Sequence, residues 1–178
     1  MNKYTIIACS FATAMAFALT AAQSQTMDSN ATKPSRADQT FLKEAIEGDL
    51  AEVDMGKLAQ GKAQSQAAKQ FGQMLEQDHG QHLQKAKEMA QQMGLTPPTE
   101  PNAHQKKMYD ELSDLSGAQF DKKFAQEMVS DHKKDINKYE KEAKSKGPLA
   151  SFAQKTVPTL QKHLQTAESL AGQRSSRR

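Results

Sequence analysis

Four long segments of the chain place apolar residues at the spacing of an α-helix. Within each segment apolar side chains recur every three or four residues, so they gather on one face of a helix. The predicted helices cover residues 36–60, 65–93, 118–146 and 148–171, and glycines or prolines follow their ends. A shorter helix is expected within residues 101–115. The pattern therefore predicts an all-α protein.

The lengths of the connections predict how these helices are arranged. The first and last connections between the long helices are short, whereas the central one is long and carries the short extra helix. A single long crossover is typical of ferritin-like four-helix bundles, and a plain up-and-down bundle has short loops throughout. We therefore expect residues 36–171 to form one ferritin-like four-helix bundle with a short helix on its crossover.

Residues 1–22 have the pattern of a secretory signal peptide. Lys3 precedes an apolar run over residues 6–19, and small residues follow the run. This run is shorter than the roughly 20 residues of a permanent transmembrane helix. We expect cleavage near Ala22 or Ser24, export to the periplasm, and no stable membrane span in the mature protein.

The predicted mature chain begins and ends with polar segments. Residues 23–35 show no apolar periodicity and are expected to form a flexible tether, and residues 172–178 a disordered basic tail. Cys9, the one cysteine, lies within the predicted signal peptide. A mature chain without it can form no disulfide bond.

Composition excludes several classes of protein. Hydrophobic residues make up 37% and charged residues 25% of the chain, which is too polar for a multi-span membrane protein and too apolar for a disordered one. The net charge of +3 is small, so nucleic acid is not expected as a partner. The chain also carries neither a nucleophile-elbow motif nor a phosphate-binding glycine loop, which argues against a hydrolase.

An internal repeat places polar residues on the apolar faces of two helices. Residues 71–82 align without gaps with residues 124–135, and each copy has a phenylalanine seven positions before an Asp-His pair. At about 100° per residue, these pairs lie within the apolar arcs of their helices. The pairs are Asp78 with His79 and Asp131 with His132. Two further polar residues on such faces are Glu52 in the first helix and His163 in the last.

The positions of these residues along their helices predict that they converge. His132 and His163 lie at similar distances from the turn at Gly147, so they should be level in an antiparallel pair. Glu52 is expected about one helical turn from that level. His82 and His104 are expected to be exposed rather than ligands.

Two interpretations of this polar group stay open. Carboxylates and imidazoles projecting inward from all four helices are the ingredients of metal sites in bundles, and iron, manganese, zinc or copper could use such ligands. Alternatively, the residues form an Asp–His hydrogen-bond network without metal, which is the commoner way to satisfy buried polar groups. The candidate metal ligands are Glu52, Asp78, His79, Asp131, His132 and His163. The full Glu-x-x-His pattern of di-iron oxidases is incomplete, because only residues 76–79 match it.

The chain resembles a bacterial exported family within the ferritin-like group. The family is the domain of unknown function numbered four-one-four-two, often named "predicted outer membrane protein". The resemblance covers residues 38–170 and is carried by motifs at residues 71–79, 117–121, 128–135 and 158–164. It implies a ferritin-like bundle in the cell envelope and brings no established reaction. By position, the six candidate ligands match the family's polar core.

These observations predict an exported, periplasmic helical bundle that is not an enzyme, with metal binding as its leading molecular activity. Two alternatives remain. One is a metal-dependent oxidase or a metal- or peroxide-scavenging enzyme, and the other is a module that binds another protein of the envelope.

Overall fold

Five α-helices form the part of the chain that the computed structural model describes, residues 33–172. They are α1 (Arg36–Lys62), α2 (Gln66–Gln92), α3 (Ala103–Ser113), α4 (Gly117–Ala143) and α5 (Ala150–Gly172). No strand occurs among these residues, so the all-α prediction is confirmed. The predicted signal peptide, the tether up to residue 32 and the tail beyond residue 172 lie outside the described residues.

Local chemistry explains where the helices begin and end. At the start of α1, the Ser35 hydroxyl accepts a hydrogen bond from the Asp38 backbone N–H, and the Asp38 carboxylate accepts one from the Ser35 N–H, forming a capping box. The end of α4 at Ala143 comes three residues before the predicted end. Pro148 disfavours the helical conformation in the residue before it, so the chain turns through residues 144–149 before α5 begins.

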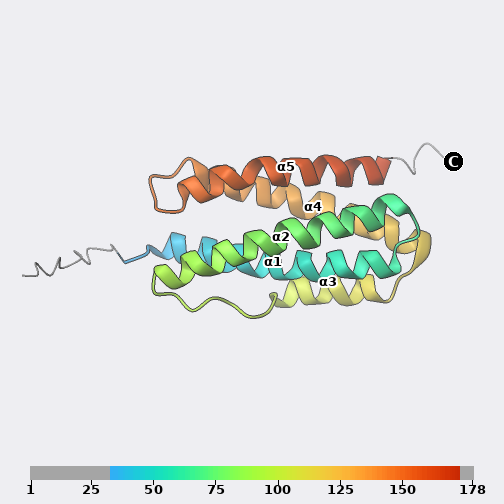
Figure 1. Ribbon diagram of the computed structural model, residues 1–178, viewed down its shortest axis with the longest axis horizontal. Helices are drawn as coiled ribbons and strands as arrows, with labels where there is room; N and C mark the ends of the chain where they lie inside the picture. The colour runs from blue at the N-terminus through green and yellow to red at the C-terminus, as the bar shows by residue number, and fades with distance from the viewer. Residues whose placement is uncertain (1–32, 173–178) are drawn as a thin grey trace, which may run out of the picture. The chain divides into compact units, whose positions relative to one another are not determined.

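The long helices pack as two hairpins joined by the crossover that carries α3 (Figure 1). α1 packs along α2, α4 packs along α5, and α3 lies against α1 and α4. The Asp121 carboxylate, near the start of α4, accepts hydrogen bonds from the backbone N–H groups of Gln64 and Ser65 at the start of α2. Helices α2 and α4 therefore run parallel, as the crossover topology requires. The predicted four-helix bundle with a short helix on its crossover is confirmed.

Two glycines allow α1 and α2 to approach each other very closely. A Cβ atom on Gly56 would lie 2.6 Å from the Gly72 carbonyl oxygen, and a Cβ atom on Gly72 would lie 2.6 Å from the Gly56 oxygen. Any larger residue at either position would collide with the opposite backbone. This contact sets the distance between the two helices about six residues from the connection that joins them.

The apolar core consists of two clusters, and polar residues lie between them on every long helix. One cluster contains Met55, Phe71, Phe124 and Met128, and the other is built around residues such as Ile46, Tyr139, Leu149 and Leu160. Burial of these side chains supplies the main driving force for folding. Among the described helices, none is both long enough and apolar enough to cross a membrane.

Candidate metal centre

Four buried polar side chains, one from each long helix, meet between the two apolar clusters. They are Glu52 of α1, His79 of α2, His132 of α4 and His163 of α5, and none is more than 5% exposed. Each lies on the apolar stripe of its helix, so the packing of that stripe carries the polar group inside. All four were predicted from the sequence to face the core.

The internal repeat and the parallel direction of α2 and α4 explain why two of the histidines are level. Phe71 and Phe124 hold the same place in the two copies of the repeat, and their ring centroids lie 5.8 Å apart. His79 and His132 follow eight residues later in each copy, and their ring centroids are also 5.8 Å apart. Equal spacing along parallel helices thus brings the two imidazoles together.

The ligand atoms of this group are close enough to share one ion. One ring nitrogen from each of His79, His132 and His163 lies within 4.8 Å of the others. The Glu52 Oε2 atom is 2.7 Å from His79 Nε2, and Oε1 is 3.4 Å from His132 Nδ1. Glu52 reaches the histidines through its side chain, which is compatible with the expectation that it lies about one helical turn from their level.

Each imidazole is held in place through one of its nitrogens, here called the outer nitrogen. In His132 this atom is Nδ1, which also lies 3.4 Å from Glu52 Oε1. These outer nitrogens donate hydrogen bonds of 2.9 Å to oxygen acceptors: His79 Nδ1 to Asp49 Oδ1, His132 Nδ1 to the Met128 carbonyl and His163 Nε2 to Asp78 Oδ2. Carboxylate and carbonyl oxygens only accept hydrogen bonds, so the outer nitrogens carry the protons. The inner nitrogens of neutral rings are therefore free lone pairs, as in metal-bound histidines whose orientation is fixed by such partners.

The inner side of the group has acceptors but few donors. His132 Nε2 and His163 Nδ1 face each other at 3.2 Å, although both rings already donate through their outer nitrogens. Both oxygens of Glu52 and the Nε2 atom of His79 are buried without an aligned hydrogen bond to any described residue, despite the short Glu52–His79 separation. Such an arrangement needs a proton or a metal cation between its lone pairs.

The electrostatics of the group follow from burial and close charges. Burial by itself would raise the pKa of the Glu52 carboxyl, but the positive charges of His132 and His79 lower it to about 2. Burial disfavours the charged form of His79, yet Glu52 and Asp49 raise the His79 pKa well above its usual value. For His163, burial and the charge of His79 lower the pKa to about 4. At neutral pH without metal, His79 is thus the cation beside Glu52, and His163 is neutral.

Comparison with known proteins identifies the family of this chain. The model of a domain of unknown function, DUF4142, matches residues 22–170. The chain belongs to the DUF4142 family. No curated protein and no solved structure matches it. The family description assigns no activity, so the chemistry of this DUF4142 protein has to be inferred from the residues of the site.

The two remaining predicted ligands occupy different places in the DUF4142 bundle. Asp78 contacts the centre indirectly, because its carboxylate accepts the hydrogen bond from His163 Nε2. Asp131 is half-buried and pairs with Lys134 at 3.3 Å, and no direct contact with the three histidines is observed within the described residues. Burial and the charge of Glu52 raise the pKa of Asp131. Together with Glu52 it lines a cavity of about 140 Å³ between α1, α3 and α4.

Two residues that support the centre were missed as site residues in the sequence. Asp49, which is 3% exposed, accepts from His79, and its other oxygen lies 2.6 Å from His82 Nδ1. The signal was present, because Asp49 lies four residues after Ala45 and three before Glu52 on the apolar stripe of α1. His82 was expected to be exposed, but the Asp49 contact holds it half-buried. His104 is exposed, as expected.

Proposed function

We propose that this protein binds one transition-metal ion in the core of its bundle. The inner nitrogens of His79, His132 and His163 and the carboxylate of Glu52 would be its ligands. The observation that carries the proposal is the convergence of one ring nitrogen from each of three histidines on three helices. The outer nitrogen of each imidazole is already bound to an acceptor, and Glu52 of the fourth long helix contacts His79. No reaction is assigned to the centre.

The donor set fits the metals expected from the sequence. Imidazole nitrogens suit zinc, copper and iron, and a carboxylate oxygen extends the range to manganese. Calcium and magnesium prefer sites built from oxygen atoms, so three imidazoles do not suit them. Ligand His79 is oriented by Asp49 and ligand His163 by Asp78, which is the outer support that metal-binding histidines usually have.

The composition of the site favours one ion over two. Di-iron and di-manganese bundles use a Glu from each of two helices and a Glu-x-x-His pair from each of the other two. Here a single carboxylate, Glu52, contacts two of the imidazoles, those of His79 and His132, and the other nearby carboxylates bind the outer nitrogens or a lysine. One glutamate among three histidines neutralises a divalent ion only in part.

A network without metal is the competing interpretation. It needs a proton on an inner nitrogen of His132 or His163, because these atoms face each other at 3.2 Å. The lowered pKa of His163 makes that proton unfavourable on His163 at neutral pH. A cation between the rings would satisfy both nitrogens and Glu52 at once. The metal-free network would instead place this proton on His132 Nε2, so measurement of the metal content distinguishes the two forms.

Elemental analysis of the purified protein tests the proposal. We expect close to one iron, manganese, zinc or copper ion per chain, and a melting temperature that rises when the matching ion is added to metal-free protein. In the double variant H79A/H132A the metal content should fall below about 0.1 per chain, since two ligands are lost. The control H104A changes an exposed histidine of α3 and should keep its metal.

The proposal can be separated from a loss of folding. Far-ultraviolet circular dichroism would show whether the double variant keeps its helices, and a milder variant, E52Q, removes the negative ligand while preserving its size. E52Q should bind the ion more weakly than the parent protein. A parent protein that holds less than about 0.1 ion per chain and shows no thermal shift with any of the four metals would overturn the proposal.

We also propose that the mature protein acts in the cell envelope. The basic start, apolar run and small-residue exit over residues 1–22 support export. The family match begins at residue 22, where the predicted signal peptide ends.

A further inference from the structure

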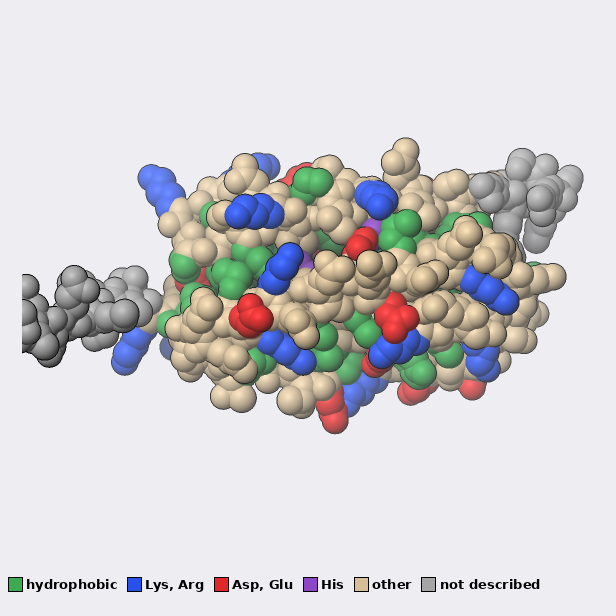
Figure 2. All heavy atoms as spheres, in the orientation of Figure 1, with side chains coloured by type: hydrophobic (Ala, Val, Ile, Leu, Met, Phe, Trp, Pro, Cys, Tyr) green, Lys and Arg blue, Asp and Glu red, His purple; other side chains and the backbone are tan. Residues whose placement is uncertain are grey.

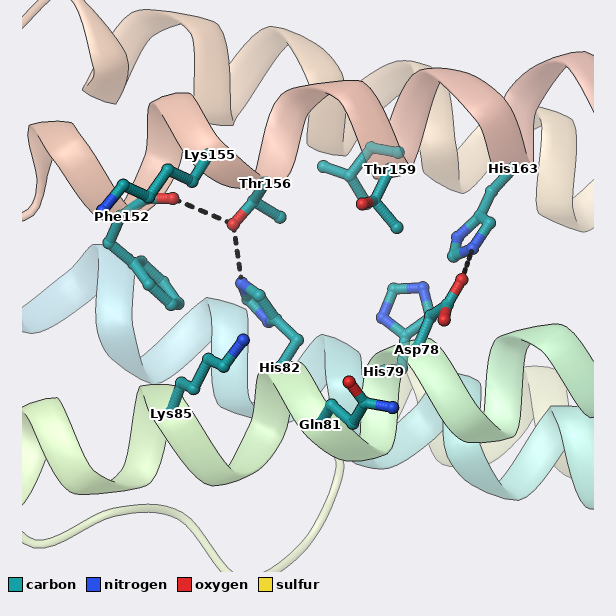
Figure 3. Close-up of a pocket in the computed structure, with 11 residues that line it drawn as sticks. Asp78, His79, Gln81, His82, Lys85, Phe152, Lys155, Thr156, Thr159 and His163 are labelled. Atoms are coloured by element: carbon teal, nitrogen blue, oxygen red, sulfur yellow. Dashed lines mark hydrogen bonds and ion pairs between the residues drawn. The ribbon is translucent and has the colours of Figure 1, made fainter.

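A second feature of the bundle is an open cavity between α2 and α5. Its volume is about 200 Å³, and it is lined by residues from both helices, among them His79, Lys85, Lys155, Thr159 and His163. Figure 3 shows these side chains around the gap between the two helices. In the space-filling view, histidine atoms are visible from outside beside lysine side chains (Figure 2).

The inner end of the cavity reaches the candidate metal centre. His79 and His163, two of the proposed ligands, form part of its wall. The other two proposed ligands do not line it, so the centre is reached from this side between α2 and α5. A small molecule in the cavity would therefore lie beside two of the proposed ligand side chains.

The charges around the cavity favour an anion. Lys85 and Lys155 line it and are exposed, and neither forms an ion pair with any residue that the structure describes. The acidic residue in the wall, Asp78, already accepts the hydrogen bond from His163. Thr159 adds a hydroxyl for which no hydrogen bond to described residues is found. The lining thus offers unpaired positive charge and a free donor.

The cavity on the opposite side of Glu52 has a different character. It is lined by the carboxylates of Asp131 and Asp135, which pair with Lys134 and Lys138. Its lysines are thereby neutralised and offer no unpaired positive charge to an anion. The two openings toward the core therefore differ in charge, and the α2–α5 cavity is the one suited to a negative ligand.

We propose that the α2–α5 cavity binds a small anion in contact with the metal ion of the core. This inference rests on the proposed metal centre and adds the class of ligand that reaches it. A volume of about 200 Å³ is below the range of about 300–1,000 Å³ of drug-sized ligand sites, so the ligand is a small inorganic or carboxylate-bearing anion. Lys85 and Lys155 would draw it in, and the Thr159 hydroxyl would donate to it.

Azide is a suitable probe, because it is a small anion whose binding near Co²⁺ changes the visible absorption of the ion. The purified protein is first loaded with Co²⁺, the bound cobalt is counted, and azide is then titrated. We expect a saturable change in the cobalt spectrum. In the double variant K85E/K155E the cobalt content should be unchanged, and the azide dissociation constant should rise about tenfold or more.

A matched control separates the cavity from the overall charge of the protein. Lys122 and Lys141 are exposed on α4, line neither cavity described above, and form no ion pair with described residues. The double variant K122E/K141E makes the same change in net charge and should keep its azide affinity within about twofold. A third variant, T159F, fills the cavity and should weaken azide binding while cobalt remains bound.

The outcomes distinguish this inference from the proposed function. If cobalt binds but azide leaves its spectrum unchanged, the anion cavity is wrong and the metal centre stands. Equal weakening in K85E/K155E and K122E/K141E would also overturn the cavity, because it would show a general charge effect. If the protein takes up no cobalt, iron, manganese, zinc or copper, both the metal centre and the anion cavity are overturned.

Discussion

His132 Nε2 and His163 Nδ1 face each other at 3.2 Å inside the bundle, although each ring already donates a hydrogen bond through its other nitrogen. Two neutral imidazoles arranged in this way would point lone pairs at each other. The contact is stable only with a proton or a metal cation between the rings. The packing that holds the rings in this orientation therefore favours the binding of one or the other. The nearby Glu52 oxygens and His79 Nε2 are buried as well, and without metal the proton of the His79 cation lies between them.

The carboxylate of Asp49 should control how tightly the metal is held. In D49N, one of the two imidazoles facing residue 49 meets an amide NH₂ group in place of an acceptor, and His79 loses its fixed orientation. Metal affinity should fall about 10–100-fold while the helices remain folded. Competition with a chelator of known affinity measures the change.

Asp54 provides the matched control for this change. It is exposed on the same helix, and the one partner observed for it in the described region is Lys57, at 4.0 Å. D54N should therefore bind metal like the parent protein. Equal affinities in D49N and the parent would show that Asp49 does not orient a ligand.

The stability of the metal-free protein should depend on pH through His163. The pKa of His163 is lowered from 6.5 to about 4 in the folded protein. Between pH 4 and pH 6.5 this histidine is therefore protonated to a greater extent in the unfolded chain than in the folded protein. This contribution to the free energy of unfolding therefore falls as the pH falls, by up to about 1.4 kcal/mol per pH unit. Urea unfolding of the parent and of H163N at several pH values should show the gap between them shrinking from pH 6.5 to 4.

The titration of Asp135 has the opposite effect on the free energy of unfolding, over a pH range that overlaps that of His163. Burial and the charge of Glu52 raise the pKa of Asp135 from 3.8 to about 6, so here the folded protein binds the additional proton. The variant D135N removes this contribution, and its stability should fall more steeply with acid than that of the parent.

A gap between the parent and H163N that stays constant with pH would contradict the lowered pKa of His163.

The close approach of α1 and α2 predicts a large cost for one added methyl group. In G72A the new Cβ would lie 2.6 Å from the Gly56 oxygen, so the helices must move apart. The free energy of unfolding should fall by about 1–3 kcal/mol. In G80A, on the same helix, the new methyl meets no atom within 4 Å. That variant should be more stable by about 0.5–1 kcal/mol, and a loss in G80A as large as in G72A would contradict the collision.

Export predicts a processed N-terminus. When the full chain is made in a bacterium with a periplasm, the envelope fraction should contain protein that begins near Gln23 or Gln25, because cleavage is expected near Ala22 or Ser24. Mass spectrometry of the intact protein would reveal this. A charge in the apolar run, as in F17D, should leave the chain unprocessed in the cytoplasm. Retention of Met1 by parent protein in the envelope fraction would argue against a cleaved signal.

The helices were predictable because their signals are local. Apolar residues at helical spacing, with Gly61, Gly94 and Gly147 near the ends, placed all five helices to within a few residues. The long central connection predicted the crossover. Errors occurred at the ends, as at Ala143, where competition between turn geometry and a further helical turn decides the boundary.

The candidate centre was predictable only in part. The presence of Glu52, His79, His132 and His163 on apolar stripes predicted their burial, because a helix that packs its apolar face takes every residue on that face inside. The role of Asp49 was not predicted, and the prediction that Asp131 is a ligand stays a prediction. Each residue turns a helix by about 100°, so a residue at the edge of a stripe reaches the centre or the surface according to small rotations of the packed helix.

The sequence by itself determined the helices, the crossover and at least one polar position that each long helix carries into the core, since these follow from periodicity and spacing along one chain. Only the tertiary structure decided that the Glu52 side chain reaches the histidines, that Asp49 and Asp78 bind outer nitrogens, and which nitrogens face inward. Those features depend on the distance between helices at Gly56 and Gly72 and on side-chain rotation, which are set by packing between segments far apart in the chain.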